Sequence, residues 1–115
     1  MILGTGIDII EISRIQKAAQ RWGQDFLDHV FTPDEIACAQ KYKFPYSHYA
    51  GRFAAKEAVF KALGDDQVSW KDLNILNDPQ GKPYCVFRKK GFHHKIFLTI
   101  SHSKNYAVAQ AIVEA

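Results

Sequence analysis

ILGTGIDII, at residues 2–10, is the segment from which the fold of this chain can be predicted. Its side chains alternate with the period of two that is typical of a β-strand, so residues 2–10 are predicted to form one. Gly4, Gly6 and Asp8 share one face of that strand, and two glycines there indicate that another backbone or a ligand comes close. The strand is expected to be mostly buried, where a carboxylate such as Asp8 is costly unless it is paired, hydrogen-bonded or metal-bound.

A first helix is predicted at residues 12–22, directly after the strand. Its apolar positions recur every three or four residues and form a stripe that should face the core. They are Ile12, Ile15, Ala19 and Trp22. The opposite side of the helix carries the basic residues Arg14, Lys17 and Arg21. Gly23 is predicted to end the helix.

Two further helices have clear start signals. Thr32-Pro33-Asp34-Glu35 combines an N-cap threonine, a proline at the first helical position and a glutamate three residues after the cap. A second helix is therefore predicted from this point to about Tyr42. Pro45 opens a third helix, which is predicted to run to Leu63 and to end at Gly64.

The rest of the chain is predicted to form strands joined by turns, because apolar and polar residues alternate along it. The predicted strands are residues 73–76, 84–87, 96–101 and 107–113, with turns at 77–82 and 103–105. No repeat or linker divides the sequence. The predicted fold class is α+β, with a single domain at residues 1–115 in which the N-terminal strand and helices pack on an antiparallel sheet.

Composition excludes several classes of protein. With 47% hydrophobic and 23% charged residues, the chain is not expected to be disordered. Cys38 and Cys85 are too far apart, and too few, for a disulfide framework or a zinc site. The N-terminus has no basic stretch before an apolar one, and no membrane span is predicted, so a cytoplasmic protein is expected.

The net charge of +3 is mild, and it favours an acidic partner or a phosphorylated ligand. A nucleic-acid binder would present a basic stripe interleaved with exposed aromatic residues. Arg14, Lys17 and Arg21 form a basic stripe, but Trp22 is expected on the buried side of that helix. Binding to nucleic acid is therefore not expected.

Three charged residues are candidates for chemistry. Taken singly, each has a structural interpretation: Asp8 could cap the next helix or pair with a lysine, and Glu57 could form a solvated ion pair with Lys61. Taken together, the two carboxylates suit Mg²⁺, which usually takes one or two protein carboxylates and completes its shell with water and substrate phosphate. Arg52 and Lys56, on the neighbouring helix face, could then hold anionic oxygens, as transfer from a diphosphate requires.

His102 lies in Ser101-His102-Ser103, at the end of a predicted strand, where a histidine is usually a surface residue. A hydrolase triad with Asp8 is disfavoured, because the chain has no G-x-S-x-G nucleophile elbow. Gly4-Thr5-Gly6 lacks the third glycine of a dinucleotide-binding loop, and His93-His94 has no second pair of metal ligands at a useful spacing.

Four motifs resemble those of one enzyme family. They are Gly4-Thr5-Gly6-Ile7-Asp8-Ile9-Ile10-Glu11, Arg52-Phe53-Ala54-Ala55-Lys56-Glu57-Ala58, Asn77-Asp78 followed by Gly81-Lys82-Pro83, and Ser101-His102-Ser103 followed by Tyr106-Ala107. In order and spacing they are similar to the motifs of the holo-acyl-carrier-protein synthases, the short bacterial 4′-phosphopantetheinyl transferases. Each motif is modestly specific, and four in register are strongly so.

The resemblance implies a reaction in support of fatty acid biosynthesis. The serine hydroxyl of an apo-acyl carrier protein attacks the β-phosphate of coenzyme A, phosphopantetheine is transferred, and adenosine 3′,5′-bisphosphate leaves. Asp8 and Glu57 are implied as Mg²⁺ ligands. Glu57 is also implied as the base on the serine, either directly or through a metal-bound water, and Lys61 as the residue that stabilises the leaving phosphate. The other residues implied to contact coenzyme A are the phosphate ligands Arg52, Lys56 and His102 and the adenine-side loop Gly81-Lys82-Pro83.

The resemblance also implies partners. Bacterial members of this short class are homotrimers with shared active sites, and the acidic carrier protein is expected to dock on Arg14, Lys17 and Arg21. Many relatives have a longer helical segment before the histidine strand, whereas only residues 88–95 are available here. The alternative function is a non-catalytic carrier-protein or nucleotide-binding module that kept the fold and lost turnover.

Overall fold

The structure, a computed structural model, describes residues 1–64 and 68–115. Its strands are β1 (Ile2–Glu11), β2 (Leu73–Asn77), β3 (Pro83–Phe87), β4 (Lys95–His102) and β5 (Tyr106–Glu114). Its helices are α1 (Ile12–Trp22), α2 (Gln24–Val30), α3 (Pro33–Ala39) and α4 (Tyr46–Leu63), with the short 3₁₀ helix η1 (Trp70–Asp72) before β2. The α+β prediction is confirmed, and the strands lie close to their predicted bounds.

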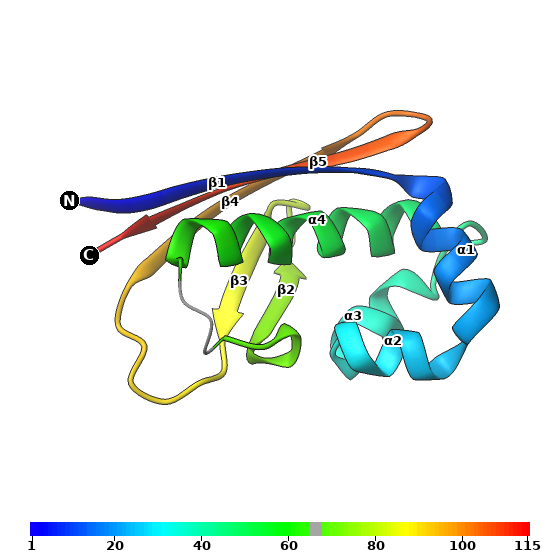
Figure 1. Cartoon of the computed structure of the whole chain (residues 1–115), viewed down its shortest axis with the longest axis horizontal. Helices are drawn as coiled ribbons and strands as arrows, with labels where there is room; N and C mark the ends of the chain where they lie inside the picture. Colours follow the sequence, from blue (N-terminus) through cyan, green and yellow to red (C-terminus); the bar gives the residue numbers. More distant parts are fainter. Residues whose placement is uncertain (65–67) are drawn as a thin grey trace.

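The strands form two separate antiparallel units. β1, β5 and β4 make a sheet in that order, whereas β2 and β3 make a hairpin that is not hydrogen-bonded to the sheet. Figure 1 shows α4 running along one face of the three-stranded sheet, with α1, α2 and α3 gathered at one end and both termini at the other. α4 therefore lies between the sheet and the rest of the molecule.

α4 packs closely against both the sheet and the hairpin, because many of its buried residues are small. It ends as predicted at Gly64, whose positive φ of 62° lets its N–H close the last turn on the carbonyl of Phe60. The buried alanines of α4 have small side chains, so neighbouring elements can come close to the helix. They pack against side chains from the sheet and the hairpin. Among the described residues, no helix combines the length and the apolar character needed to cross a membrane.

β1 passes so close to α4 that only glycine fits at two of its positions. A side-chain carbon on Gly6 would overlap the carbonyl oxygen of Ala58, and one on Gly4 would overlap that of Ala62. The close approach predicted from the two glycines is therefore confirmed, and the approaching backbone is that of α4. Asp8 follows on the same face of the strand, so its side chain is also directed toward α4.

α1 has the predicted bounds but a narrower apolar stripe. Ile12 and Ile15 are buried, and the three basic residues of the opposite side are exposed as predicted. Trp22 corrects the prediction, because it is 59% exposed and its ring lies 4.8 Å from the guanidinium of Arg21. Trp22 is the last residue of α1, and the chain turns into α2 at Gly23. The C-terminal end of the apolar stripe of α1 therefore lies outside the core.

The segment between α1 and α4 differs most from the prediction. α2 is an unpredicted helix, and its N-cap makes no side-chain hydrogen bond that could have marked its start. α3 begins at the predicted capping box, in which Thr32 and Glu35 bond reciprocally to each other's backbone N–H. It ends at Ala39 rather than near Tyr42, because the chain turns back there toward the start of α4.

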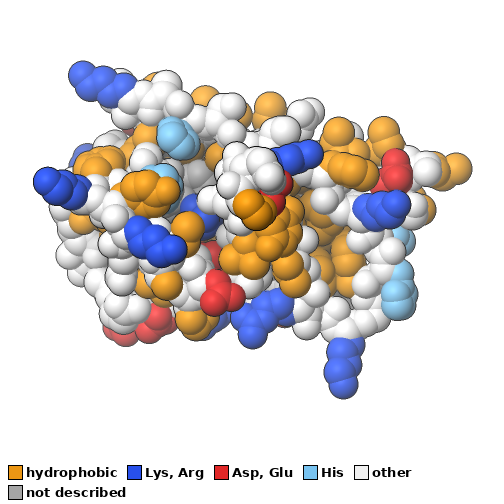
Figure 2. Space-filling view, turned by 180° about the vertical axis from the view of Figure 1, so that it is seen from behind, with side chains coloured by type: hydrophobic (Ala, Val, Ile, Leu, Met, Phe, Trp, Pro, Cys, Tyr) orange, Lys and Arg blue, Asp and Glu red, His pale blue; other side chains and the backbone are white. Residues whose placement is uncertain are grey.

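The outer face of the three-stranded sheet, which points away from α4, exposes large hydrophobic side chains. The expectation that β1 is mostly buried was wrong for this face, since Ile7 and Ile9 are 61% and 65% exposed. Leu3 on β1 and Phe97 on β4 are also exposed. Figure 2 shows further hydrophobic side chains gathered on the back of the molecule. Extended apolar surface of this kind typically marks an interface.

Candidate active site

β1 and α4 bring three charged side chains together. The ammonium of Lys61 donates to the carbonyl oxygen of Ile7 at 2.9 Å and to Oδ1 of Asp8 at 3.3 Å. Asp8 therefore forms the lysine pair that the sequence left open. Glu57 lies one helical turn before Lys61, but among the described residues no ion pair joins these two side chains. Lys61 is thus drawn toward β1 rather than along its own helix.

The carboxyl group of Glu57 faces a like charge. Burial raises the pKa of Glu57, and the negative charge of Asp8 raises it further, whereas Lys61 lowers it. The side chain of Asp8 is 17% exposed and that of Lys61 is 54% exposed, so solvent reaches the group. A cation bound between the two carboxylates would relieve both the burial and the repulsion.

The donor set at this position suits Mg²⁺. Two carboxylates from different elements are the protein ligands that this ion commonly takes, and they leave positions for water and substrate phosphate. The described part of the chain has no group of three or more His, Cys, Asp or Glu side chains that could hold a metal ion. A magnesium site here would therefore depend on Asp8 and Glu57.

A second set of predicted residues lines a cavity of about 270 Å³, which we call the cationic cavity. Arg52 of α4 and His102 of β4 lie in its wall, together with Gly81 of the turn between β2 and β3 and with Pro83, the first residue of β3. Residues far apart in the sequence thus meet at one place, as the motifs predict. Two cationic or protonatable side chains in one wall make it suited to an anion.

His48 is a member of this cavity that the sequence analysis missed. Its ring stacks on Tyr42 at 3.7 Å and lies edge-on to His102 at 6.2 Å, between ring centroids. Burial lowers the pKa of His48, and the charges of Arg52 and His102 lower it further. The signal was present in the sequence, because His48 precedes Arg52 by four residues and so shares its helix face.

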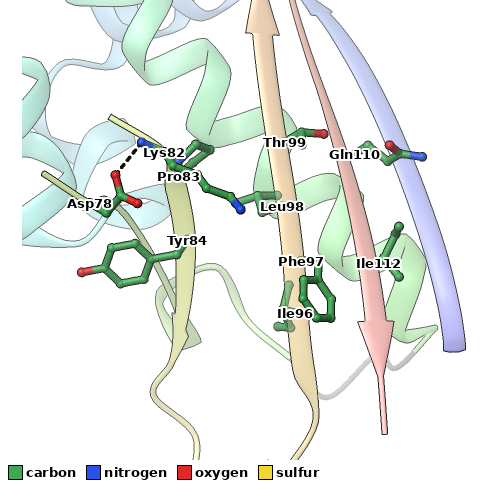
Figure 3. Close-up of a pocket in the computed structure, with 10 residues that line it drawn as sticks. All are labelled: Asp78, Lys82, Pro83, Tyr84, Ile96, Phe97, Leu98, Thr99, Gln110 and Ile112. Carbon is green, nitrogen blue, oxygen red and sulfur yellow. Dashed lines mark hydrogen bonds between the residues drawn. The ribbon is translucent and has the colours of Figure 1, made fainter. Parts of the chain in front are cut away.

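A larger cavity of about 410 Å³ opens beside the cationic cavity, between the hairpin and the sheet (Figure 3). Pro83 belongs to both cavities, so they adjoin. Lys82 and Tyr84 come from the hairpin side, and the carboxylate of Asp78 holds the turn by accepting from the backbone N–H of Lys82 at 2.8 Å. The sheet side of this cavity is largely apolar. It includes Ile96, Phe97, Leu98 and Ile112.

Lys56 lies in neither cavity. Its ammonium is fully buried and donates to Glu35 at 2.7 Å, to the carbonyl of Val30 at 2.8 Å and to that of Trp70 at 2.9 Å. These bonds use all three of its protons. The predicted contact between Lys56 and a coenzyme A phosphate therefore does not fit this structure. The reason is that this side of α4 is covered rather than solvated.

The segment before the histidine strand is as short as the sequence indicated. Residues 88–94 form a turn with no helix. Phe92 from this turn stacks on Phe87 of β3, with ring centroids 3.9 Å apart. The turn is thereby attached to the hairpin.

The two parts of the candidate site lie at opposite edges of the three-stranded sheet. Asp8 belongs to the edge strand β1, and His102 belongs to the other edge strand, β4. Their partners in β5 are Ala109 and Ala107, so both parts lie at the same end of the sheet. Asp8, Glu57 and Lys61 line neither of the two cavities.

A family profile described as the 4′-phosphopantetheinyl transferase superfamily matches residues 4–111. The chain belongs to this superfamily. The match includes the close-approach glycines of β1, all three charged residues beside them and the histidine at the end of β4.

The holo-acyl-carrier-protein synthases within this superfamily are similar to the chain over its length. The holo-[acyl-carrier-protein] synthase of Protochlamydia amoebophila is 47% identical over 119 residues, which cover 97% of this chain and 98% of that protein. A crystal structure of the holo-(acyl-carrier-protein) synthase of Bacillus anthracis, in complex with CoA (3′,5′-ADP), has a TM-score of 0.89 and 41% identity, over 100% of this chain and 98% of that one. The structure of the Helicobacter pylori holo-[acyl-carrier-protein] synthase in complex with coenzyme A has a TM-score of 0.87 and 32% identity. The match covers 96% of this chain and 99% of that one. The family resemblance of the motifs is therefore confirmed.

Proposed function

We propose that this protein transfers 4′-phosphopantetheine from coenzyme A to a serine of apo-acyl carrier protein and releases adenosine 3′,5′-bisphosphate. The observation that carries the proposal is the group of Asp8, Glu57 and Lys61, which β1 and α4 hold together in a chain that matches the family from end to end. Relatives with coenzyme A bound support the same donor. The product would serve fatty acid biosynthesis, and the cytoplasm stays the predicted location.

Each charged residue has a task in this reaction. The serine oxygen forms a bond to the β-phosphorus of coenzyme A, and the bond from that phosphorus to the leaving bisphosphate oxygen breaks. Glu57 accepts the serine proton as the general base. Lys61 places its positive charge where negative charge builds on the leaving group, so it acts mainly on the transition state.

Asp8 and Glu57 would hold Mg²⁺, and the bound ion would supply positive charge to the diphosphate oxygens. Arg52, His48 and His102 bind the phosphate at the nucleotide end of coenzyme A in the cationic cavity. The adjoining cavity beside Gly81, Lys82 and Pro83 takes the adenine, since its sheet side is apolar.

The test is mass spectrometry of an apo-acyl carrier protein incubated with coenzyme A, Mg²⁺ and this protein. Transfer adds the mass of one phosphopantetheine arm to the carrier protein and produces the bisphosphate. The alternative, a non-catalytic carrier-protein or nucleotide-binding module, predicts binding of coenzyme A or carrier protein without any mass gain. That result would contradict the proposal.

We also propose that the protein is a homotrimer with shared active sites. The apolar outer face of the sheet needs a cover, and the two parts of the site lie at opposite edges of that sheet. A neighbouring chain that packs against the sheet would bring the β1 edge of one chain to the β4 edge of the next. Light scattering should give the mass of three chains, and I7K/I9K should give folded, inactive monomers. An active wild-type monomer would contradict this proposal.

The acidic carrier protein is proposed to dock on α1, whose Arg14, Lys17 and Arg21 are exposed on one side. Reversing Arg14 and Arg21 to glutamate should raise KM for the carrier protein about tenfold or more, while KM for coenzyme A stays unchanged. The dependence of kcat/KM on ionic strength should become flatter, because salt screens the attraction that has been removed. Steady-state kinetics with each substrate varied in turn measure both effects.

A matched control reverses two basic residues at the other end of the molecule, with the same change in net charge. Arg88 and Lys90 are exposed there, in the turn that follows β3, far from α1 (Figure 1). R88E/K90E should leave KM for the carrier protein near the wild-type value. Equal losses in both double variants would mean that net charge, rather than docking on α1, governs the encounter.

A further inference from the structure

The hairpin of β2 and β3 is not attached to the rest of the molecule by strand pairing. Its strands pair with each other and not with β1, β5 or β4. Leu73 and Ile75 bury their side chains in the core. Hydrophobic contact of this kind is non-directional, so it resists separation but does not fix where the hairpin sits along α4. Hydrogen bonds from neighbouring elements must supply that position.

Glu35 of α3 supplies one of these bonds, directly to the backbone of β2. It is fully buried, and its Oε2 accepts from the backbone N–H of Ile75 at 2.6 Å. Its Oε1 accepts from the N–H of Thr32 at 2.8 Å and from Lys56 at 2.7 Å. One carboxylate thus joins α3, α4 and β2, and its charge is matched by the buried ammonium of Lys56.

Arg52 binds the other backbone polar group of the same residue. Its Nε donates to the carbonyl of Ile75 at 3.2 Å, while its side chain also lines the cationic cavity. A second anchor joins the preceding residue to α3, because Asn74 accepts from the hydroxyl of Thr32 at 2.6 Å and donates to Asp34 at 3.1 Å. Ile75 stands two residues before Asn77, where the wall of the cationic cavity begins.

We propose that Glu35 is a positioning residue for coenzyme A: by fixing Ile75 it sets the turn at 77–83 against Arg52 and His102. This inference rests on the proposed function, since the turn is argued to contact the nucleotide end of coenzyme A. Glu35 touches no ligand itself. Lys56 serves as its charge partner, which gives this buried lysine a role in place of the phosphate contact expected from the sequence.

Two double variants isolate the bond from Glu35 to Ile75. E35L/K56M and E35Q/K56M both remove the buried charges and keep similar side-chain volumes, so neither leaves an unpaired ion in the core. They differ in whether residue 35 can accept a hydrogen bond from the N–H of Ile75. E35L/K56M should bind coenzyme A about tenfold more weakly than E35Q/K56M, which should stay within about twofold of wild type.

Three measurements follow this comparison. Calorimetric titration with coenzyme A gives the affinities, and kcat at saturating coenzyme A should change less than about twofold, because Asp8, Glu57 and Lys61 are untouched. Hydrogen exchange at the Ile75 amide should be faster in E35L/K56M than in E35Q/K56M, while amides of β5 stay unchanged. N74A provides a milder variant, should E35L/K56M not fold, and is expected to weaken binding in the same direction by a few-fold.

The outcomes separate this inference from the proposed function. A wild-type protein that binds no coenzyme A would overturn the proposed function, and this inference with it. Wild-type binding with equal affinities in the two double variants, or with Ile75 exchanging equally slowly in both, would overturn the positioning role alone. Unchanged affinity in N74A, when E35L/K56M does not fold, would overturn it as well.

Discussion

Replacing Glu57 with glutamine is expected to lower the rate of transfer strongly and, at the same time, to stabilise the ligand-free protein. The pKa of Glu57 is raised by burial and by the charge of Asp8. A carboxyl whose pKa is higher in the folded state binds its proton more tightly there, so its contribution to stability is present at low pH and is lost as pH rises through that pKa. At neutral pH the ionised Glu57 therefore costs stability, which glutamine removes.

The expected gain is about 0.5 kcal/mol, because Glu57 is partly exposed and solvent screens its interactions. The expected loss in kcat/KM is about 10²-fold or more, as for removal of a catalytic base. Thermal unfolding and transfer assays measure the two effects. Mg²⁺ should raise the melting temperature of the wild type but not that of Glu57→Gln, since binding to the folded state stabilises it by mass action.

Lys61→Met is the matched control for this pair of effects. It also removes one charge from the group, but it leaves Asp8 without the ammonium that lies 3.3 Å away and leaves the two carboxylates facing each other. Lys61→Met should therefore lower stability where Glu57→Gln raises it, and it should lower kcat more than it raises KM for coenzyme A. Glu57→Gln with wild-type transfer, or with lower stability than wild type, would contradict the proposed role.

The elements that could be predicted from the sequence are those whose signals are local. The capping box at Thr32 and the glycine after Leu63 mark helix ends through short-range hydrogen bonds. The two glycines of β1 also predicted the close approach of another backbone, because few residues other than glycine fit where two backbones come so near. Asp8 was singled out for a related reason, since a carboxylate in a buried strand needs a partner, whereas Glu57 was singled out by its spacing of four from Lys61 and by the family motif.

What could not be predicted depends on which element covers which side chain. Arg52 and Lys56 look like a solvated helix edge in the sequence, yet both are buried, because α3 and the hairpin cover that side of α4. Ile7 and Ile9 look like core residues, yet they are exposed on the outer face of the sheet. The pattern fixes which residues share a face, whereas burial of that face is decided by tertiary or quaternary contacts.

Gly6→Ala should destabilise the protein by about 3 kcal/mol or more, because overpacking against atoms that cannot move is among the costliest substitutions. The added carbon would overlap the carbonyl oxygen of Ala58 and lie 2.9 Å from the backbone nitrogen of Ala62. Both atoms belong to α4, so relief requires β1 and the helix to separate. Denaturant unfolding measures the loss of stability, and transfer should be lost even where the protein still folds, since Asp8 would move away from Glu57.

Gly51→Ala is the matched control. It is the same substitution, at a glycine of α4 that also faces the sheet. Its added carbon would meet the side chain of Ile100 at 3.1 Å, and a side chain can give way where a backbone cannot. Alanine also favours the helix over glycine by up to about 1 kcal/mol. Stability should therefore be kept or raised. Gly6→Ala with wild-type stability would mean that β1 and α4 tolerate a wider spacing, and the positions of Asp8 and Glu57 would then need another cause.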